Sequence, residues 1–147
     1  MKLISLLILT LFVGKGCDNK TDQDINTAVI EYVANTRGYY QKITIAQQVV
    51  TISEDRAAKE KGKTEKISDA DWKTLITLLE EVDLEALKNL KAPTEKRFYD
   101  GAAIANLQIT YKGITYKAPS FDHGFPPDEI TEIVNKINSF SKQDDEY

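Results

Sequence analysis

Two groups of residues in this chain have types and spacing that could do chemistry. The first is Cys17, the only cysteine, which follows the apolar segment Leu3–Val13 and the small residue Gly16. A thiol at the start of a polar stretch is out of place in a core, but it is suited to be the nucleophile that accepts a diacylglyceryl group. The alternatives are a free thiol or a disulfide to another chain, because one cysteine cannot form an internal disulfide.

The second group lies on two loops and contains aromatic and ionisable side chains. Its members are Arg97, Phe98, Tyr99 and Asp100 before one hairpin, and Phe121, Asp122, His123 and Phe125 after it. The start of the first strand of a hairpin and the end of the second lie at the same edge, so we expect the two loops to be neighbours.

Two interpretations of this loop cluster remain open. In the first, its aromatic and arginine side chains form a binding surface of the kind found at interface hot spots. In the second, Phe98, Phe121 and Phe125 plug the open end of the core, and Arg97 pairs with Asp100 or Asp122.

The sequence offers little support for a metal site or for catalysis. Asp122 and His123, the only histidine, would supply two ligands, whereas zinc sites use three or four. We find no nucleophile motif and no phosphate-binding glycine loop. We therefore expect no metal, no cofactor and no enzymatic activity.

The segment before Cys17 has the features of a secretory signal: Lys2, then an apolar run, then small residues. As a helix, Leu3–Val13 would span about 16 Å, which is too short for a bilayer core of about 30 Å. The segment resembles a bacterial lipoprotein signal. This resemblance implies that residues 1–16 are a signal peptide, that Cys17 carries lipid such as palmitate, and that residues 17–26 are a flexible tether.

The residues that follow Cys17 bear on location. The acidic stretch Asp18–Asp24 resembles the export signal of surface lipoproteins of Bacteroidota. An Asp directly after the lipidated cysteine also resembles the inner-membrane retention signal of enterobacteria. We expect a cell-envelope protein that is held to the membrane, most simply the outer membrane, by lipid on Cys17, with the leaflet left open.

Charge and length restrict the class of protein. Removal of residues 1–16 takes away Lys2 and Lys15, so the formal net charge changes from −4 to −6. An acidic body does not favour nucleic acid as a partner. The remaining length suits one domain.

The hydrophobic pattern predicts strands and two helices. Strands are expected over 28–33, 39–46, 49–53, 107–112 and 114–118, and the charged run 54–66 is expected to be a solvated hairpin tip or connection. Ser68 with Asp71 resembles a capping box and starts one helix, on whose buried stripe we place Trp72. The other helix follows Pro126–Pro127, and the apolar stripe that it is expected to bury ends at Phe140.

The order is therefore β-β-β-α-β-β-α. We expect a single two-layer α+β domain over 27–141, with a mostly antiparallel sheet of about five strands, two amphipathic helices on one face, and a disordered tail over 142–147.

In element order the body resembles the emfourin-type inhibitors of thermolysin-like metalloproteases. The resemblance rests on Thr36–Tyr39 at a hairpin corner, Val82–Leu84 after the first helix, Asp100 before the next hairpin, and the closing helix Pro127–Phe140. It implies a protease inhibitor. Our first expectation is instead a non-catalytic binding or structural module with an unidentified protein partner, and a hydrolase or metal-binding enzyme comes third.

Overall fold

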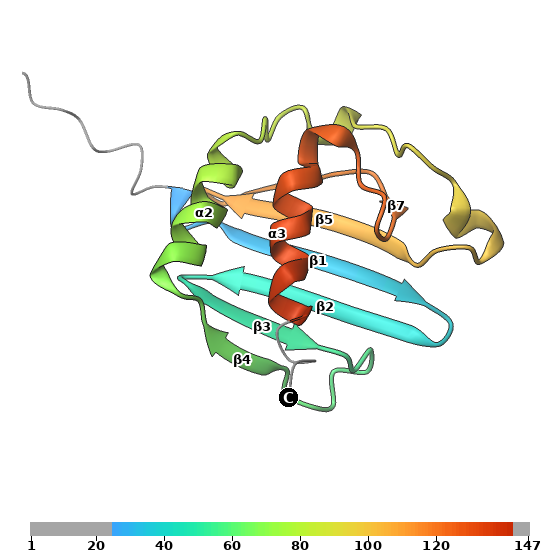
Figure 1. Cartoon of the computed structure of the whole chain (residues 1–147), viewed down its shortest axis with the longest axis horizontal. Coiled ribbons are helices and arrows are strands. Elements are labelled where there is room, and N and C mark those ends of the chain that lie inside the picture. Colours follow the sequence, from blue (N-terminus) through green and yellow to red (C-terminus); the bar gives the residue numbers. More distant parts are fainter. Residues whose placement is uncertain (1–24, 143–147) are drawn as a thin grey trace, which may run out of the picture.

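The computed structural model describes residues 25–142, which form an antiparallel sheet covered by two helices. Six strands lie in the order β4-β3-β2-β1-β5-β6, and β7 pairs with β5. Helices α2 and α3 lie over one face of the sheet (Figure 1). The expected two-layer α+β architecture is confirmed. The bounds are β1 Val29–Thr36, β2 Tyr39–Ala46, β3 Val49–Ser53, β4 Lys63–Lys66, α2 Asp69–Glu80, β5 Ile104–Tyr111, β6 Ile114–Lys117, β7 Phe121–Asp122 and α3 Thr131–Lys142.

The core lies between the helices and one face of the sheet. Alternate residues of each central strand point to this face, as the period of two requires. The fully buried members include Tyr32 on β1, Ile43 on β2 and Ile109 on β5. They meet Leu75 of α2 and Ile137 of α3, which are also fully buried. The apolar area that these residues bury is the main favourable contribution to folding.

The sheet has more strands than the pattern predicted. β4 forms within the charged run that was expected to be a loop, and all four of its residues are exposed. It pairs with β3, and the hydroxyls of Thr51 and Thr64 lie 3.2 Å apart across the two strands. A polar edge strand has no hydrophobic alternation to reveal it. Its charges protect the open edge from pairing with other chains.

The second strand of the last hairpin does not end at Ala118. It resumes as β7, which pairs with the start of β5 through Ala105 and Phe121. The register shifts by one residue between the Gln108–Lys117 pair and this pair, so the strand carries a bulge that includes Pro119. The bulge turns Phe121 into the core.

Ser68 caps α2 as expected, because its hydroxyl oxygen accepts from the Asp71 N–H at 3.1 Å. The return bond of a capping box is replaced: the Ser68 hydroxyl donates to the Asp71 carboxylate at 2.7 Å. Lys136 of α3 also pairs with Asp71 at 2.6 Å, which joins the two helices. Trp72 packs against the core from the expected stripe, but it is only partly buried.

The first described residue, Ile25, packs against the core, and the last one, Lys142, belongs to helix α3. The expected signal peptide, Cys17, most of the expected tether and residues 143–147 of the expected tail lie outside the described residues. Between residues 25 and 142, no helix is both long enough and apolar enough to span a bilayer.

Candidate binding surface

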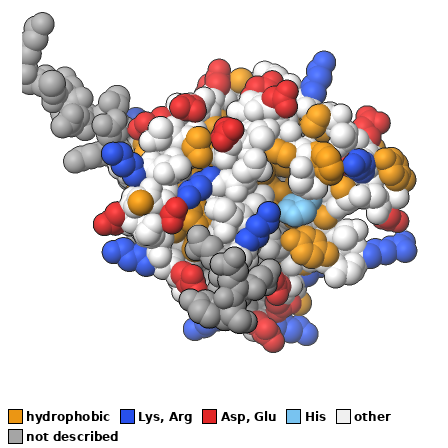
Figure 2. Space-filling model, viewed as in Figure 1, with side chains coloured by type: hydrophobic (Ala, Val, Ile, Leu, Met, Phe, Trp, Pro, Cys, Tyr) orange, Lys and Arg blue, Asp and Glu red, His pale blue; other side chains and the backbone are white. Residues whose placement is uncertain are grey.

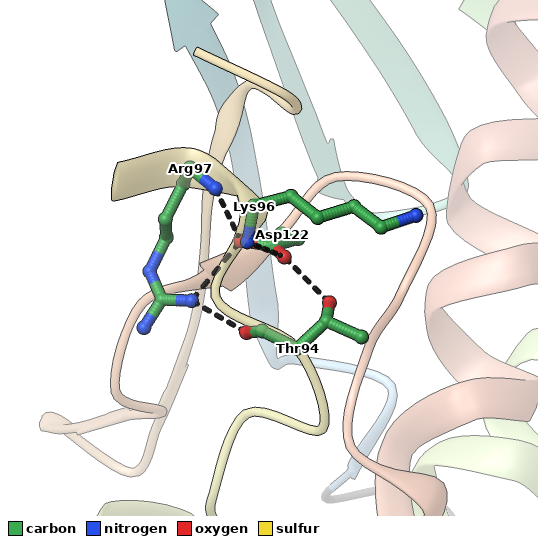
Figure 3. Close-up of polar contacts among 4 residues, drawn as sticks. All are labelled: Thr94, Lys96, Arg97 and Asp122. Carbon is green, nitrogen blue, oxygen red and sulfur yellow. Dashed lines mark hydrogen bonds and ion pairs between the residues drawn. The ribbon is translucent and has the colours of Figure 1, made fainter. Parts of the chain in front are cut away.

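A buried carboxylate organises the loop cluster. Asp122 of β7 is fully buried and accepts four hydrogen bonds (Figure 3). The donors are the Thr94 hydroxyl at 2.5 Å, the Lys96 N–H at 2.7 Å, and the Arg97 N–H and Nη1, each at 3.0 Å. Arg97 Nη1 also donates to the Thr94 carbonyl at 2.8 Å. We call these four residues the Asp122 cluster.

The Asp122 cluster is suited to a structural role, in which it holds the 94–97 loop against the sheet. Burial by itself would raise the pKa of Asp122, but the hydrogen bonds from Thr94, Arg97 and Lys96 outweigh it and hold the pKa at about 2. The carboxylate is therefore ionised, and its oxygens are occupied by donors. Such a group is suited to fix a loop on the sheet and poorly suited to take up a proton from a substrate.

The loop that this cluster fixes carries two exposed aromatic rings. Lys96–Tyr99 form one turn of 3₁₀-helix, η2, which ends at Asp100 with φ +58°. Phe98 and Tyr99 are each 71% exposed. The Arg97 guanidinium lies over the Phe98 ring, 4.3 Å from its centroid. A side chain anchored in the Asp122 cluster therefore also holds an exposed ring.

More apolar side chains are exposed at the same end of the sheet. Phe125 follows β7, Ile104 begins β5 opposite Asp122, and Tyr39 begins β2. The Lys96 ammonium lies 3.9 Å from the centroid of the Phe125 ring. Figure 2 shows hydrophobic side chains around the histidine in this region. We call the set the aromatic end surface: Tyr39, Phe98, Tyr99, Ile104 and Phe125. Ile104 alternates with the buried Ala105, so it lies on the face of the sheet that the helices do not cover.

The aromatic end surface contains most of the exposed large hydrophobic residues of the described chain. The remaining one, Ile114, is 54% exposed at the start of β6, where it pairs with Tyr111 at the other end of β5. Single exposed apolar residues are ordinary, whereas a group of them marks an interaction site.

His123 lies between the aromatic end surface and the core. Its Nδ1 is 2.7 Å from the Tyr32 hydroxyl, and its ring centroid is 5.9 Å from those of Tyr32 and Tyr39. Burial lowers the pKa of His123, and Lys142 of α3 lowers it further. Burial also raises the pKa of Tyr32 to about 12. At neutral pH the pair is therefore an uncharged imidazole and a protonated phenol.

The structure brings the two loops together, and it divides the residues named from the sequence into separate roles. Arg97 pairs with Asp122, and Phe121 is buried against Tyr32. Phe98 and Phe125 do not plug the core with Phe121, because both are exposed. Asp100 is exposed at the end of η2 and makes no ion pair with Arg97 among the described contacts.

Sequence reasoning missed several residues of the site. Thr94 and Lys96 lie in the same loop as Arg97, and their role depends on bonds to Asp122 that no spacing indicates. Tyr39 was expected in a strand, and neither Tyr39 nor Ile104 was expected to belong to the site. A strand-end position for an aromatic residue was the one available signal for Tyr39.

The described residues do not form a metal centre. Within 25–142, no group of three or more His, Cys, Asp or Glu side chains is placed to hold a metal ion. Asp122 and His123 are consecutive, but their side chains contact different partners, the 94–97 loop and Tyr32.

Comparison with known proteins gives no relative. No family model, no curated protein and no solved structure matches this chain. The resemblances to bacterial lipoproteins and to emfourin-type inhibitors therefore stay predictions.

Proposed function

We propose that this chain is a lipid-anchored protein of the bacterial cell envelope that binds a partner protein through the aromatic end surface. The observation that carries the proposal is the pair Phe98 and Tyr99, each 71% exposed on a loop that a buried ion pair holds in place.

The energetics support recognition. Exposed aromatic area is unfavourable in water by about 25 cal/mol for each Å². Burying a carboxylate with a guanidinium also has a desolvation cost, so such a pair is weak evidence for a role in stability alone. Here the pair serves to present two rings outward. Aromatic and arginine side chains on a preorganised loop are the usual anchors of protein interfaces.

The position of the surface favours a protein over the anchoring membrane. The chain from Cys17 enters β1 at Val29, which pairs with Thr110 near the end of β5. The aromatic end surface lies at the opposite end of β1, where Asn35 pairs with Ile104. An eight-residue strand separates the two ends, a distance of roughly 23 Å. The expected tether would thus join the domain at the end opposite the aromatic end surface.

The binding proposal is tested by photo-cross-linking in cells that produce the protein. A photoreactive phenylalanine analogue is placed at Phe98, and a matched control carries it at Ile114, which is exposed but lies at the other end of β5. We expect one protein to be captured from position 98 and not from position 114, and capture to be lost when Tyr99→Ala is added. Equal capture from both positions would contradict the proposal.

The anchoring proposal is tested separately by acyl labelling. The full-length chain should incorporate labelled palmitate and sediment with membranes, and globomycin should block its maturation. Cys17→Ser should abolish both labelling and sedimentation. Recovery of an unlabelled chain with its first methionine still attached, from the cytoplasm, would overturn this part of the proposal.

A further inference from the structure

We propose that His123 makes binding at the aromatic end surface depend on pH: the neutral imidazole docks on Tyr32 and holds the surface in its binding form, and protonation undocks it. The link to binding rests on the proposed function above. The link between protonation and the shape of the surface rests on the following contacts alone.

In the proposed docked state the Tyr32 hydroxyl is the donor and the neutral His123 ring is the acceptor. The Tyr32 side chain is fully buried, and its hydroxyl lies 2.7 Å from His123 Nδ1. Because the pKa of Tyr32 is raised to about 12, the hydroxyl is protonated at neutral pH, and in the proposed docked state it donates a hydrogen bond to Nδ1. Nδ1 can accept only while it carries no proton, so the neutral ring carries its proton on Nε2.

The backbone connects this ring directly to the aromatic end surface. The His123 N–H donates to the Ala103 carbonyl at 2.9 Å, beside Ile104. The Phe125 N–H donates to the Asp122 carbonyl at 2.9 Å, so His123 and Gly124 occupy the centre of a tight turn. Gly124 has φ +88°. In the proposal, loss of the contact with Tyr32 acts through this turn on the position of Phe125.

The groups around His123 make its protonation unfavourable in the docked position. Tyr32 on β1 and Tyr39 on β2 contact the ring, and neither supplies a negative charge at neutral pH. Lys142 on α3 repels a second positive charge. Asp122, the preceding residue, has its carboxylate occupied by the 94–97 loop, and Glu54 acts on Tyr39. Protonation is thus relieved by moving the ring into water.

A second buried group supports two arrangements of this site. The Asn138 side chain of α3 is close enough to Tyr32 to lower the pKa of its hydroxyl in part, against the larger effect of burial. Its Oδ1 is buried and has no hydrogen-bond partner in the described structure. It is therefore available to accept a hydrogen bond from the Tyr32 hydroxyl once His123 leaves.

Nuclear magnetic resonance of the full-length chain in non-ionic micelles tests the proposal, because the chain has one histidine to observe. We expect the Nε2–H tautomer above neutral pH and a pKa below that of free histidine. The Gly124 amide and the Tyr39 ring should shift with the same midpoint. In His123→Phe, which keeps an aromatic ring, these two transitions should vanish. Tyr32→Phe should remove the tautomer preference.

Two results would overturn the inference: an Nδ1–H tautomer at high pH, or Gly124 and Tyr39 signals that do not follow the imidazole. For binding, capture from position 98 should fall by at least half when the pH is lowered through the His123 midpoint, and should stay constant in His123→Phe. A fall of equal size in both proteins would contradict the regulatory role. Absence of any capture would count against the proposed function and would leave the titration to decide this inference.

Discussion

The Arg97 guanidinium lies 3.0 Å from the Asp122 carboxylate, although the two residues are 25 positions apart in the sequence. The Arg97 side chain is 10% exposed and that of Asp122 is fully buried. This pair ties η2, which lies outside the sheet, to β7 at the sheet edge. The position of Phe98 and Tyr99 therefore depends on a contact that contains neither residue.

Replacement of Asp122 by asparagine should destabilise the domain by about 3 kcal/mol, because Arg97 is left partly buried without its charge partner. Urea unfolding of the variant measures this loss. Asp128→Asn is the matched control, since Asp128 is exposed, and it should change stability by no more than about 0.5 kcal/mol. Equal effects of the two substitutions would contradict the structural role of the Asp122 cluster.

Acid should weaken the same contact. The pKa of Asp122 is about 2 in the folded chain and about 3.9 in an unfolded chain. The depressed value means that Asp122 contributes stability above about pH 4, and that this contribution is lost as the pH falls toward 2. Other carboxyls with lowered pKa values, such as Asp71 and Glu31, titrate in both proteins. The wild type should therefore lose more stability than Asp122→Asn between pH 5 and pH 2.5, and parallel curves would argue against the assignment.

The two phenylalanines named from the loop cluster should respond differently to truncation. Phe121 is fully buried, so Phe121→Ala should lower the free energy of unfolding by about 3–5 kcal/mol. Phe98 is 71% exposed, so Phe98→Ala should change it by no more than about 0.5 kcal/mol. Thermal unfolding of both variants separates the core residue from the surface residue. A large loss in Phe98→Ala would place that ring in the core.

Gly124 should tolerate a side chain poorly because of its backbone and not because of crowding. Its φ is +88°, and a Cβ there would meet no atom within 4 Å. Gly124→Ala should therefore cost about 1–2 kcal/mol through left-handed strain. Gly38 is also open but has no positive φ, so Gly38→Ala should be neutral or stabilising by up to about 1 kcal/mol. A reversed order in urea unfolding would contradict the assigned turn.

The architecture could be predicted from the sequence because its signals are local. The strand over Tyr39–Ala46 alternates polar and apolar residues, and the structure has the same bounds. Ser68 marked the start of α2 through its capping oxygen. β4 could not be predicted in this way, because Lys63–Lys66 are all polar, so no alternation of apolar and polar residues marks the strand.

The candidate site was predictable only in outline. Hairpin geometry places the loop before β5 beside the residues after β6, and the structure has them in contact. The bulge at Pro119, however, decides that Phe121 enters the core while Asp122 receives the 94–97 loop. A one-residue shift of register reverses which side chains are buried. Burial of Asp122 follows from this long-range arrangement, and the sequence pattern does not encode it locally.

The affinity for the protein captured by photo-cross-linking tests the central claim most directly. Titration calorimetry should compare the wild type with the double variant Phe98→Ala/Tyr99→Ala and with Ile114→Ala, an exposed apolar residue outside the surface. Loss of two hot-spot rings should weaken binding by at least about 30-fold, since each such truncation costs about 1 kcal/mol or more. Ile114→Ala should bind as the wild type does. An unchanged dissociation constant in the double variant would contradict the claim that the aromatic end surface is where this protein binds its partner.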